Sequence, residues 1–285
     1  MEAIYYKEGF LILRDLKKPN SILGETLSFD SNRMEESIEF LKREGLKSIS
    51  LGNYFHLQNV DFLKNCGFVE GISILKNDLN DYSGLNYIEN LRSFSVSKLN
   101  QTINFAKFPN LEVVGLDYSK HVVNLSSCKK IFWLWLDKYK RENLIEFKEL
   151  EKIRYLNFYQ CSFENLIGID HLRELNYIKL DTIKNLRSLK GLNENLINLA
   201  VLDIYNCKSL NDYQDIAKVK SLRKLFLDKT GDAPNIEFIR DLSNLNFITV
   251  GFNVLSGDMK YLDNIETVWF KDFPHYNRKM KDFKK

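Results

Sequence analysis

A hydrophobic motif that recurs every 20 to 24 residues limits what this chain can fold into more than any other feature. The motif is apolar-x-x-apolar-x-apolar, and its eleven copies share one register. They begin at Leu46, Val69, Leu91, Leu111, Ile131, Ile153, Leu175, Leu199, Leu222, Leu245 and Ile265. A repeat this short cannot bury its own apolar residues, so successive repeats must stack to form a continuous core.

Each repeat has two parts with different periodicity. Positions 4 and 6 are apolar, with mostly polar or small residues between them, and this alternation predicts a short strand with one buried face. The second part places apolar residues three apart, most clearly at Leu166, Ile169 and Leu172. That spacing predicts one face of a helical or 3₁₀ turn. Each repeat is therefore expected to be one strand followed by a short return segment.

This pattern resembles the leucine-rich repeat, in particular the 22-residue bacterial class found in internalins. One repeat matches that consensus at Ile153, Leu156, Phe158, Cys161, Phe163, Leu166, Ile169 and Leu172. The resemblance covers about residues 46–285 and implies an α/β solenoid. Such a leucine-rich repeat horseshoe has a parallel β-sheet on its concave side and short helical or 3₁₀ segments on its convex side. It implies little about activity, because the fold is a scaffold with interchangeable faces.

The chain ends depart from the repeat, and they predict caps over the core. Residues 1–45 form an N-terminal cap, with strands at 4–6 and 10–13, a further strand at 27–29, and one helix of about a dozen residues. Ser31 is the expected N-cap of that helix. The repeat array occupies residues 46–270. Residues 271–285 form a C-terminal cap and basic tail, whose last lysines predict a solvated, disordered end.

Composition and motifs argue against several functional classes. The 41 Lys and Arg nearly balance 38 Asp and Glu, so a net charge of +3 does not indicate nucleic acid as the partner. The longest apolar run is far shorter than the roughly 20 residues of a membrane span. Phosphate-binding, zinc-protease and hydrolase motifs are absent, and His56, His121, His171 and His275 are scattered. We expect no enzyme, no cofactor and no metal site.

The cysteines predict a cytoplasmic protein with reduced thiols. Cys66, Cys128, Cys161 and Cys207 stand far apart, without a CxxC pair. The first residues carry no secretion signal, although a precursor with a trimmed signal stays open. The consensus asparagine of position 9 occurs only at Asn77 and Asn253, whereas Cys161 and Cys207 replace it in two repeats. A small donor there bonds neighbouring main chain, so both thiols are expected to be structural.

Positions 3, 5 and 7 of each repeat point away from the core if the strands alternate as predicted. All three tryptophans of the chain stand at these positions. The aromatic set there is Trp133, Trp135, Tyr155, Tyr159, Tyr177, Tyr205, Phe226 and Phe247. Large exposed apolar patches are uncommon on monomers without a binding role, and Trp and Tyr are enriched in interface hot spots. These columns therefore predict a binding surface.

Aspartates accompany the aromatic residues in the same columns. Because like charges on neighbouring strands repel, an aspartate row favours a ligand that brings positive charge. The first three repeats present mostly Ser and Gly instead, which places the contact zone in the middle and C-terminal two-thirds. The predicted partner-binding residues are Trp133, Trp135, Asp117, Asp137, Tyr155, Tyr159, Tyr177, Asp181, Asp203, Tyr205, Phe226 and Asp228.

Two other interpretations of this surface stay open. In the first, the aromatic side chains pack on one another and the aspartates accept hydrogen bonds from strand-end amides, without any partner. In the second, Asp117 and Asp137 hold calcium, which takes about six to eight oxygen ligands.

Our functional hypothesis is a cytoplasmic bacterial repeat protein whose concave face binds a protein with a basic surface. The resemblance implies that stand-alone proteins of this type include immunity proteins that neutralise toxins. An acidic and aromatic surface would match the basic groove of a nuclease toxin. The alternative is a glycan-binding or adhesion module, because aromatic rings stack on sugars; that alternative predicts secretion. An enzyme would need a compact polar pocket, which the outward columns do not indicate.

Overall fold

The computed structural model describes residues 2–15, 21–76 and 78–283 of the chain. The chain divides into two compact units, an N-terminal unit of residues 1–134 and a C-terminal unit of residues 135–285. Both units consist mostly of strands, and short 3₁₀ turns lie between many successive strands. Within the described residues, no helix is both long and apolar enough to cross a membrane.

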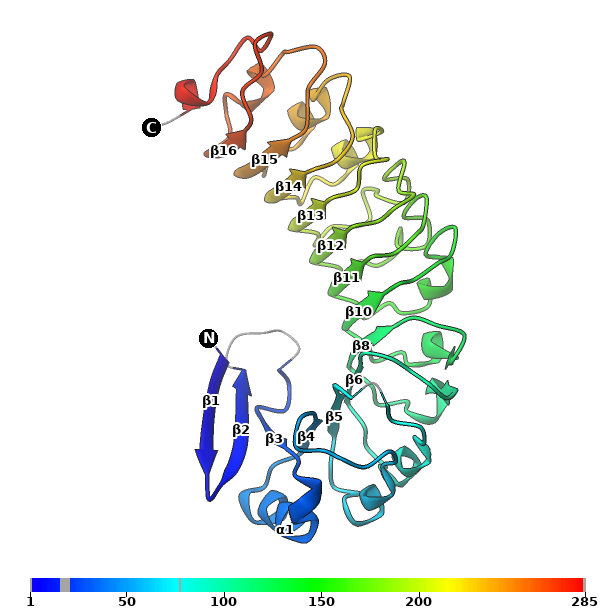
Figure 1. Ribbon diagram of the computed structural model, residues 1–285. Coiled ribbons are helices and arrows are strands. Elements are labelled where there is room, and N and C mark those ends of the chain that lie inside the picture. The colour runs from blue at the N-terminus through cyan, green and yellow to red at the C-terminus, as the bar shows by residue number, and fades with distance from the viewer. Residues whose placement is uncertain (1, 16–20, 77, 284–285) are drawn as a thin grey trace. The chain divides into compact units, whose positions relative to one another are not determined.

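The N-terminal unit begins with three strands outside the repeat (Figure 1). Strands β1 (Glu2–Lys7) and β2 (Phe10–Asp15) form an antiparallel hairpin. Its two-residue turn has positive φ at both positions, 52° at Glu8 and 80° at Gly9, which suits the twist of a tight hairpin. Strand β3 (Glu25–Ser28) then pairs with β2. All three strands occur where the sequence predicts them.

The one α-helix among the described residues, α1 (Met34–Glu44), follows a 3₁₀ turn, η1 (Ser31–Arg33). The prediction of Ser31 as N-cap of the helix was wrong, because the residue before α1 is Arg33, which makes no side-chain cap hydrogen bond. The Asp30 carboxylate accepts the N–H of Asn32 at 2.9 Å and caps the turn. The Ser31 hydroxyl instead accepts the N–H of His56 at 2.9 Å, which joins the cap to the first repeat.

Four parallel repeat strands complete the sheet of the N-terminal unit. They are β4 (Ser48–Leu51), β5 (Gly71–Ile74), β6 (Ser93–Val96) and β8 (Val113–Asp117). Two-residue strands β7 (Ile103–Asn104) and β9 (Val122–Val123) pair separately. The 3₁₀ turns are η2 (Asp61–Asn65), η3 (Ser83–Tyr87), η4 (Phe105–Lys107) and η5 (Leu125–Ser127). Position 3 of each repeat pairs with position 3 of the next, in the order Ser48, Gly71, Ser93, Val113.

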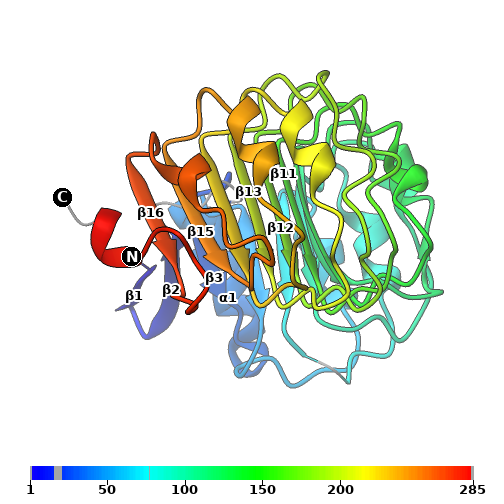
Figure 2. The same cartoon turned by 90° about the horizontal axis from the view of Figure 1, so that it is seen from above.

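The C-terminal unit continues the same parallel pattern. Strand β10 (Trp133–Asp137) spans the division between the units. The other strands are β11 (Tyr155–Tyr159), β12 (Tyr177–Asp181), β13 (Val201–Tyr205), β14 (Lys224–Asp228), β15 (Phe247–Gly251) and β16 (Thr267–Phe270). The 3₁₀ turns are η6 (Ile145–Phe147), η7 (Gln214–Lys218), η8 (Glu237–Asp241) and η9 (Lys260–Leu262). Figure 2 shows the turns of this unit on one side of its strands. All eleven predicted repeat strands therefore occur, and each begins at position 3 of its motif.

Alternation along each strand separates the core from the open face. In β12, Ile178 and Leu180 are fully buried, whereas Tyr177, Lys179 and Asp181 are half-buried. Burial of each aliphatic side chain at positions 4 and 6 stabilises the array by about 1.5–3 kcal/mol. This confirms the predicted register, because a slip of one residue would exchange the two faces.

Two repeats, residues 153–174 and 175–198, return without any helix. Leu166, Ile169 and Leu172 are fully buried as expected, but they lie in turns, so the predicted helical face was wrong here. Gly168 has φ of 112°, and a Cβ atom built on it would lie 2.4 Å from the carbonyl carbon of Leu144. Glycine at this position therefore allows the close approach of the two neighbouring backbones.

A left-handed residue follows the strand in five consecutive repeats, at position 8. These residues are Lys138, Gln160, Thr182, Asn206 and Lys229, with φ between 52° and 60°. In this conformation the backbone N–H extends the sheet by one bond, as when Thr182 donates to the Tyr205 carbonyl at 2.9 Å. The added hydrogen bond offsets the strain of a left-handed backbone in residues other than glycine.

The thiols at position 9 are structural, as the sequence predicts. Cys161 Sγ donates to the Leu136 and Tyr159 carbonyls at 3.4 and 3.3 Å and accepts the N–H of Tyr139. Cys207 Sγ reaches the Leu180 carbonyl at 3.7 Å. Burial raises the pKa of both thiols to about 12, which keeps them protonated and unreactive.

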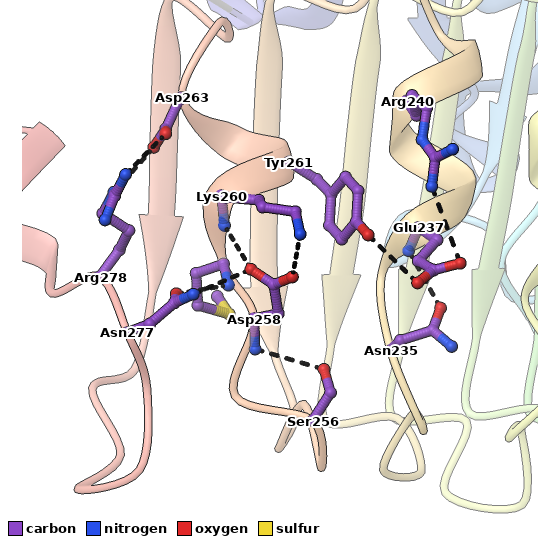
Figure 3. Close-up of polar contacts among 11 residues, drawn as sticks. Asn235, Glu237, Arg240, Ser256, Asp258, Lys260, Tyr261, Asp263, Asn277 and Arg278 are labelled. Atoms are coloured by element: carbon purple, nitrogen blue, oxygen red, sulfur yellow. Dashed lines mark hydrogen bonds and ion pairs between the residues drawn. The ribbon is translucent and has the colours of Figure 1, made fainter.

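The C-terminal segment packs on the last repeats rather than remaining disordered (Figure 3). Arg278 makes two hydrogen bonds with the Asp263 carboxylate, at 3.2 and 3.1 Å. Asn277 donates to Asp258 and accepts the N–H of Met259, both at 2.9 Å. The prediction of a disordered end concerned the last lysines, and among these Lys279 donates to the Phe273 carbonyl at 2.6 Å.

The edge of the last strand is also covered by this segment. Met280, at the start of η10 (Met280–Phe283), accepts the N–H of Phe270 through its sulfur at 3.2 Å. The ring of Phe283 packs edge-on against that of Phe270. Such cover protects a sheet edge from pairing with another chain. The final lysines of the tail, Lys284 and Lys285, lie outside the described residues.

Candidate functional site

Ten of the twelve predicted partner-binding residues lie in the C-terminal unit, on the face of the sheet opposite the 3₁₀ turns. We call this surface the aromatic–acidic face. It comprises Trp135, Asp137, Tyr155, Tyr159, Tyr177, Asp181, Asp203, Tyr205, Phe226, Asp228, Phe247 and Trp269. The other two predicted residues, Asp117 and Trp133, are half-buried residues of the N-terminal unit. The predicted site is thus divided between the units.

Three rings on this face are the most open to solvent. Trp135 is 41% exposed, Tyr159 37% and Trp269 57%. Trp269 stands at position 5 of the last repeat, directly opposite Thr249 in β15, and the prediction omitted it from the site. Its place at position 5, an outward position, was the sequence signal by which Trp269 could have been added to the predicted site.

The remaining rings are partly engaged within the face. The rings of Phe226 and Phe247 pack at a centroid distance of 4.9 Å. The Lys229 ammonium lies 4.8 Å from the centroid of Tyr205 and donates a hydrogen bond to its hydroxyl. Contacts among these side chains therefore explain part of this surface, whereas Tyr159 and Trp269 remain exposed.

Asp203 is the most enclosed carboxylate of the face. It accepts a hydrogen bond from the Tyr177 hydroxyl at 3.3 Å, and the Lys179 ammonium lies 3.9 Å away. Burial raises the pKa of Asp203, which Lys179 and Tyr177 oppose. Burial also raises the pKa of Tyr177 to about 12, with a further contribution from the Asp203 charge. Asp203 is therefore engaged mainly with side chains of the neighbouring strand, and it offers less to a partner than the other carboxylates do.

The other carboxylates are positioned by close neighbours. The Trp135 indole N–H donates to Asp137, and the Thr182 hydroxyl donates to Asp181 at 2.9 Å. At Asp228, a Cβ atom built on Gly251 in the next strand would lie 2.2 Å from a carboxylate oxygen, so glycine makes room for the charge. These hydrogen bonds come from side chains, whereas the competing interpretation expected strand-end amides as the donors.

Metal-binding chemistry finds no support in this arrangement. Within residues 2–15, 21–76 and 78–283, no group of three or more His, Cys, Asp or Glu side chains is arranged to hold a metal ion. The oxygen ligands of a calcium site are not assembled within either unit.

The outward columns of the N-terminal unit form a feature that sequence reasoning missed. Serines at positions 3 and 5 of the first three repeats line a pocket of about 280 Å³, together with residues of β1, β2 and β3. The outward columns alone do not enclose this pocket, and aliphatic residues line it beside the serines. The serines themselves were the visible signal, but the hairpin that encloses them lies outside the repeat.

No protein-family model matches the sequence, and no curated protein matches it. Solved structures do share its fold. The leucine-rich repeat ectodomain of the plant receptor kinase GASSHO1/SCHENGEN3 from Arabidopsis thaliana, in complex with CASPARIAN STRIP INTEGRITY FACTOR 2, is 15% identical with a TM-score of 0.57. The match covers 79% of this chain and 29% of that ectodomain. The fold is a leucine-rich repeat solenoid.

Two bacterial structures give the same result for this leucine-rich repeat chain. A leucine-rich repeat protein of Leptospira interrogans is 16% identical with a TM-score of 0.55, over 82% of this chain and 68% of that one. The functional domain of InlJ from Listeria monocytogenes is 14% identical with a TM-score of 0.51, over 76% and 47%. At such identities the likeness establishes the α/β solenoid fold and nothing finer.

Proposed function

We propose that this leucine-rich repeat solenoid is a protein-binding scaffold and that its aromatic–acidic face docks a partner with a basic surface. The observation that carries the proposal is the combination of exposed rings and positioned carboxylates on one sheet. Trp135, Tyr159 and Trp269 are large and open to solvent, as interface anchors are before binding. The carboxylates between them supply charge complementarity.

The geometry of the face favours recognition over simple packing. Asp137 and Asp181 are held by donors from their own strands or turns, so they lose little conformational freedom on binding. A solved neighbour of the same fold, the plant receptor ectodomain, is in complex with another molecule named as an integrity factor. Asp117 and Trp133 belong to the proposed binding set as well.

The finer form of the proposal is a cytoplasmic immunity protein that neutralises a bacterial toxin. The acidic character of the face supports a basic partner, such as the substrate groove of a nuclease toxin. The resemblance to stand-alone bacterial repeat proteins supports the rest. In this role the protein needs no catalytic residues, because covering the groove is sufficient.

Affinity capture from the native cytosol and secretome tests the proposal. The test variant combines Trp135→Ala, Asp137→Lys and Trp269→Ala. A matched control combines Ser73→Ala, Leu75→Ala and Ser95→Ala on the N-terminal unit, and both variants must keep the wild-type Tm. We expect wild type and control to capture one basic protein, and the test variant to bind it at least about 30-fold more weakly, as loss of hot-spot residues implies.

Other outcomes reject the proposal. Equal capture by all three proteins places the site elsewhere. If the wild type captures no protein but is retained on a polysaccharide resin through Trp135 and Trp269, the glycan-binding alternative replaces it. If Asp137→Lys alone leaves the affinity for the captured protein unchanged, the argument that acidic residues attract a basic partner fails.

A further inference from the structure

The pocket in the N-terminal unit is a second candidate site, and it is chemically unlike the aromatic–acidic face. Its volume of about 280 Å³ is close to the lower end of small-molecule sites. Hydroxyl side chains from β3, β4, β5 and β6 form much of the lining: Thr26, Ser48, Ser50, Ser73, Ser93 and Ser95. Figure 1 shows the hairpin β1–β2 and β3 beside these strands.

Ser50 is the most enclosed of the hydroxyl residues in the lining. Two other pairs satisfy one another, since Thr26 donates to Ser48 at 3.0 Å and Ser95 donates to Ser73 at 2.9 Å. Ser50 is only 3% exposed and lines the pocket, so its hydroxyl is one that a molecule in the pocket can reach.

Arg14 is the one charged side chain among the described residues that line the pocket. Its Nε lies 3.5 Å from a carboxylate oxygen of Glu25, which also accepts a hydrogen bond from the Tyr5 hydroxyl at 2.9 Å. Within the described chain the Arg14 guanidinium donates no hydrogen bond, so its terminal N–H groups are available. A guanidinium beside several hydroxyl donors suits a carboxylate.

Aliphatic side chains supply the rest of the lining. Leu23 lies over β5, where a Cβ atom built on Gly71 would be 2.4 Å from its Cδ1, so glycine lets Leu23 close this side. Leu75 is 57% exposed and Leu13 half-buried, which leaves apolar surface facing the pocket. The lining contains neither the aromatic ring that a sugar stacks on nor the carboxylate that a cation needs.

We propose that this pocket binds a small aliphatic carboxylate. The carboxylate accepts hydrogen bonds from Arg14 and the Ser50 hydroxyl, and a branched aliphatic group lies against Leu13, Leu23 and Leu75. The same chemistry occurs in a free N-acylated amino acid and in the C-terminal residue of a peptide. The inference is independent of the proposed function, because it uses no residue of the aromatic–acidic face.

Isothermal titration of the full chain with N-acetyl-leucine tests the proposal. We expect saturable binding, at least about tenfold weaker for N-acetyl-leucinamide, which lacks the charge, and for N-acetyl-lysine, which places a cation in the pocket. Arg14→Gln should weaken binding at least tenfold, whereas Arg43→Gln, a similarly exposed and ion-paired arginine on α1, should leave it unchanged. Ser50→Ala, which removes only the hydroxyl, should weaken binding several-fold.

A tetrapeptide with a free C-terminal leucine distinguishes the two sources. Tenfold tighter binding than N-acetyl-leucine identifies a chain end as the ligand, and equal or weaker binding identifies a small molecule. The proposal is overturned if N-acetyl-leucine and the peptide both fail to bind the folded wild type. It is equally overturned if the uncharged amide binds as tightly as the acid.

Discussion

The first three repeats and the repeats of the C-terminal unit end their strands differently. Strands β4, β5 and β6 have four residues, whereas β8, the last strand of the N-terminal unit, and β10 to β15 have five. A left-handed residue follows β10 to β14, and its N–H adds a hydrogen bond to the sheet, as at Thr182. Asp and Tyr at position 7 of β11 to β14 pair in register along the sheet.

This difference shows how one hydrophobic repeat carries two surfaces. Positions 4 and 6 are apolar and buried in both units, since they fill the core of each one. The outward positions are free to differ, and they present hydroxyls around a pocket in one unit and rings with carboxylates in the other. The predictions below test whether core, turn and face are separable in this way.

The largest expected effect concerns the buried positions 4 and 6, which occur in both units. Ile74→Ala in β5 and Leu180→Ala in β12 each remove a fully buried side chain, so each should lower the free energy of unfolding by about 2–5 kcal/mol. Ser73→Ala and Lys179→Ala change the neighbouring outward positions. Each should lower the free energy of unfolding by less than about 1 kcal/mol. Urea denaturation measures all four. Equal losses at inward and outward positions would contradict the alternation.

The thiols should resist alkylation in both units. Burial raises the pKa of Cys66 and Cys128 to about 11 and that of Cys161 and Cys207 to about 12. The folded protein at pH 8 should therefore contain at least about 100-fold less thiolate at each site than the unfolded chain. Iodoacetamide labelling followed by peptide mass spectrometry measures the rates. A thiol that reacts as fast in the native as in the denatured state is not buried.

A smaller effect, an increase in stability, is expected at the left-handed residue that follows a strand. Thr182 is β-branched and holds φ at 60°, whereas Asn206 occupies the same position in the next repeat. Thr182→Asn should stabilise the protein by about 1 kcal/mol, because asparagine tolerates the left-handed region. Lys98→Asn, at the same position in the N-terminal unit without positive φ, is the control. A similar gain in both variants, measured by thermal unfolding, would reject the proposed role of the turn.

The smallest effect is a pH dependence at Asp203. Burial raises its pKa in the folded state, so the folded protein retains this proton at pH values where the unfolded chain, with an ordinary value of 3.8, has lost it. Stability from this group therefore falls as pH rises above about 3.8. The Tm of Asp203→Asn, compared with wild type, should improve between pH 3.5 and pH 6. A relative decline would mean that Lys179 stabilises the charge after all.

The strands were predictable because their signal is local. Alternation of buried and outward residues sets position 3 in every repeat, and stacking then fixes the register between strands. The return segments were harder, since Gly168 and its close approach to Leu144 depend on the neighbouring repeat. The N-cap was predicted wrongly because a 3₁₀ turn, which Asp30 caps, precedes the α-helix and includes Ser31.

The site was predictable only in part, for a similar reason. The outward columns identify Trp135 and Asp137, which lie two residues apart and hydrogen-bond within one strand. The contact of Tyr177 with Asp203 joins neighbouring strands, so it requires the three-dimensional register. The pocket around Ser50 requires a hairpin from far outside the repeat, which no periodicity encodes.

Site-specific photo-crosslinking in native cytosol would test the central claim most directly. A benzophenone amino acid replaces Trp135 or Trp269 on the aromatic–acidic face, or Leu75 on the N-terminal unit, all three being exposed positions. We predict that one basic protein crosslinks to positions 135 and 269 and not to position 75. A crosslink to the same protein from position 75 alone, or with equal yield from all three positions, would contradict the assignment of the binding face.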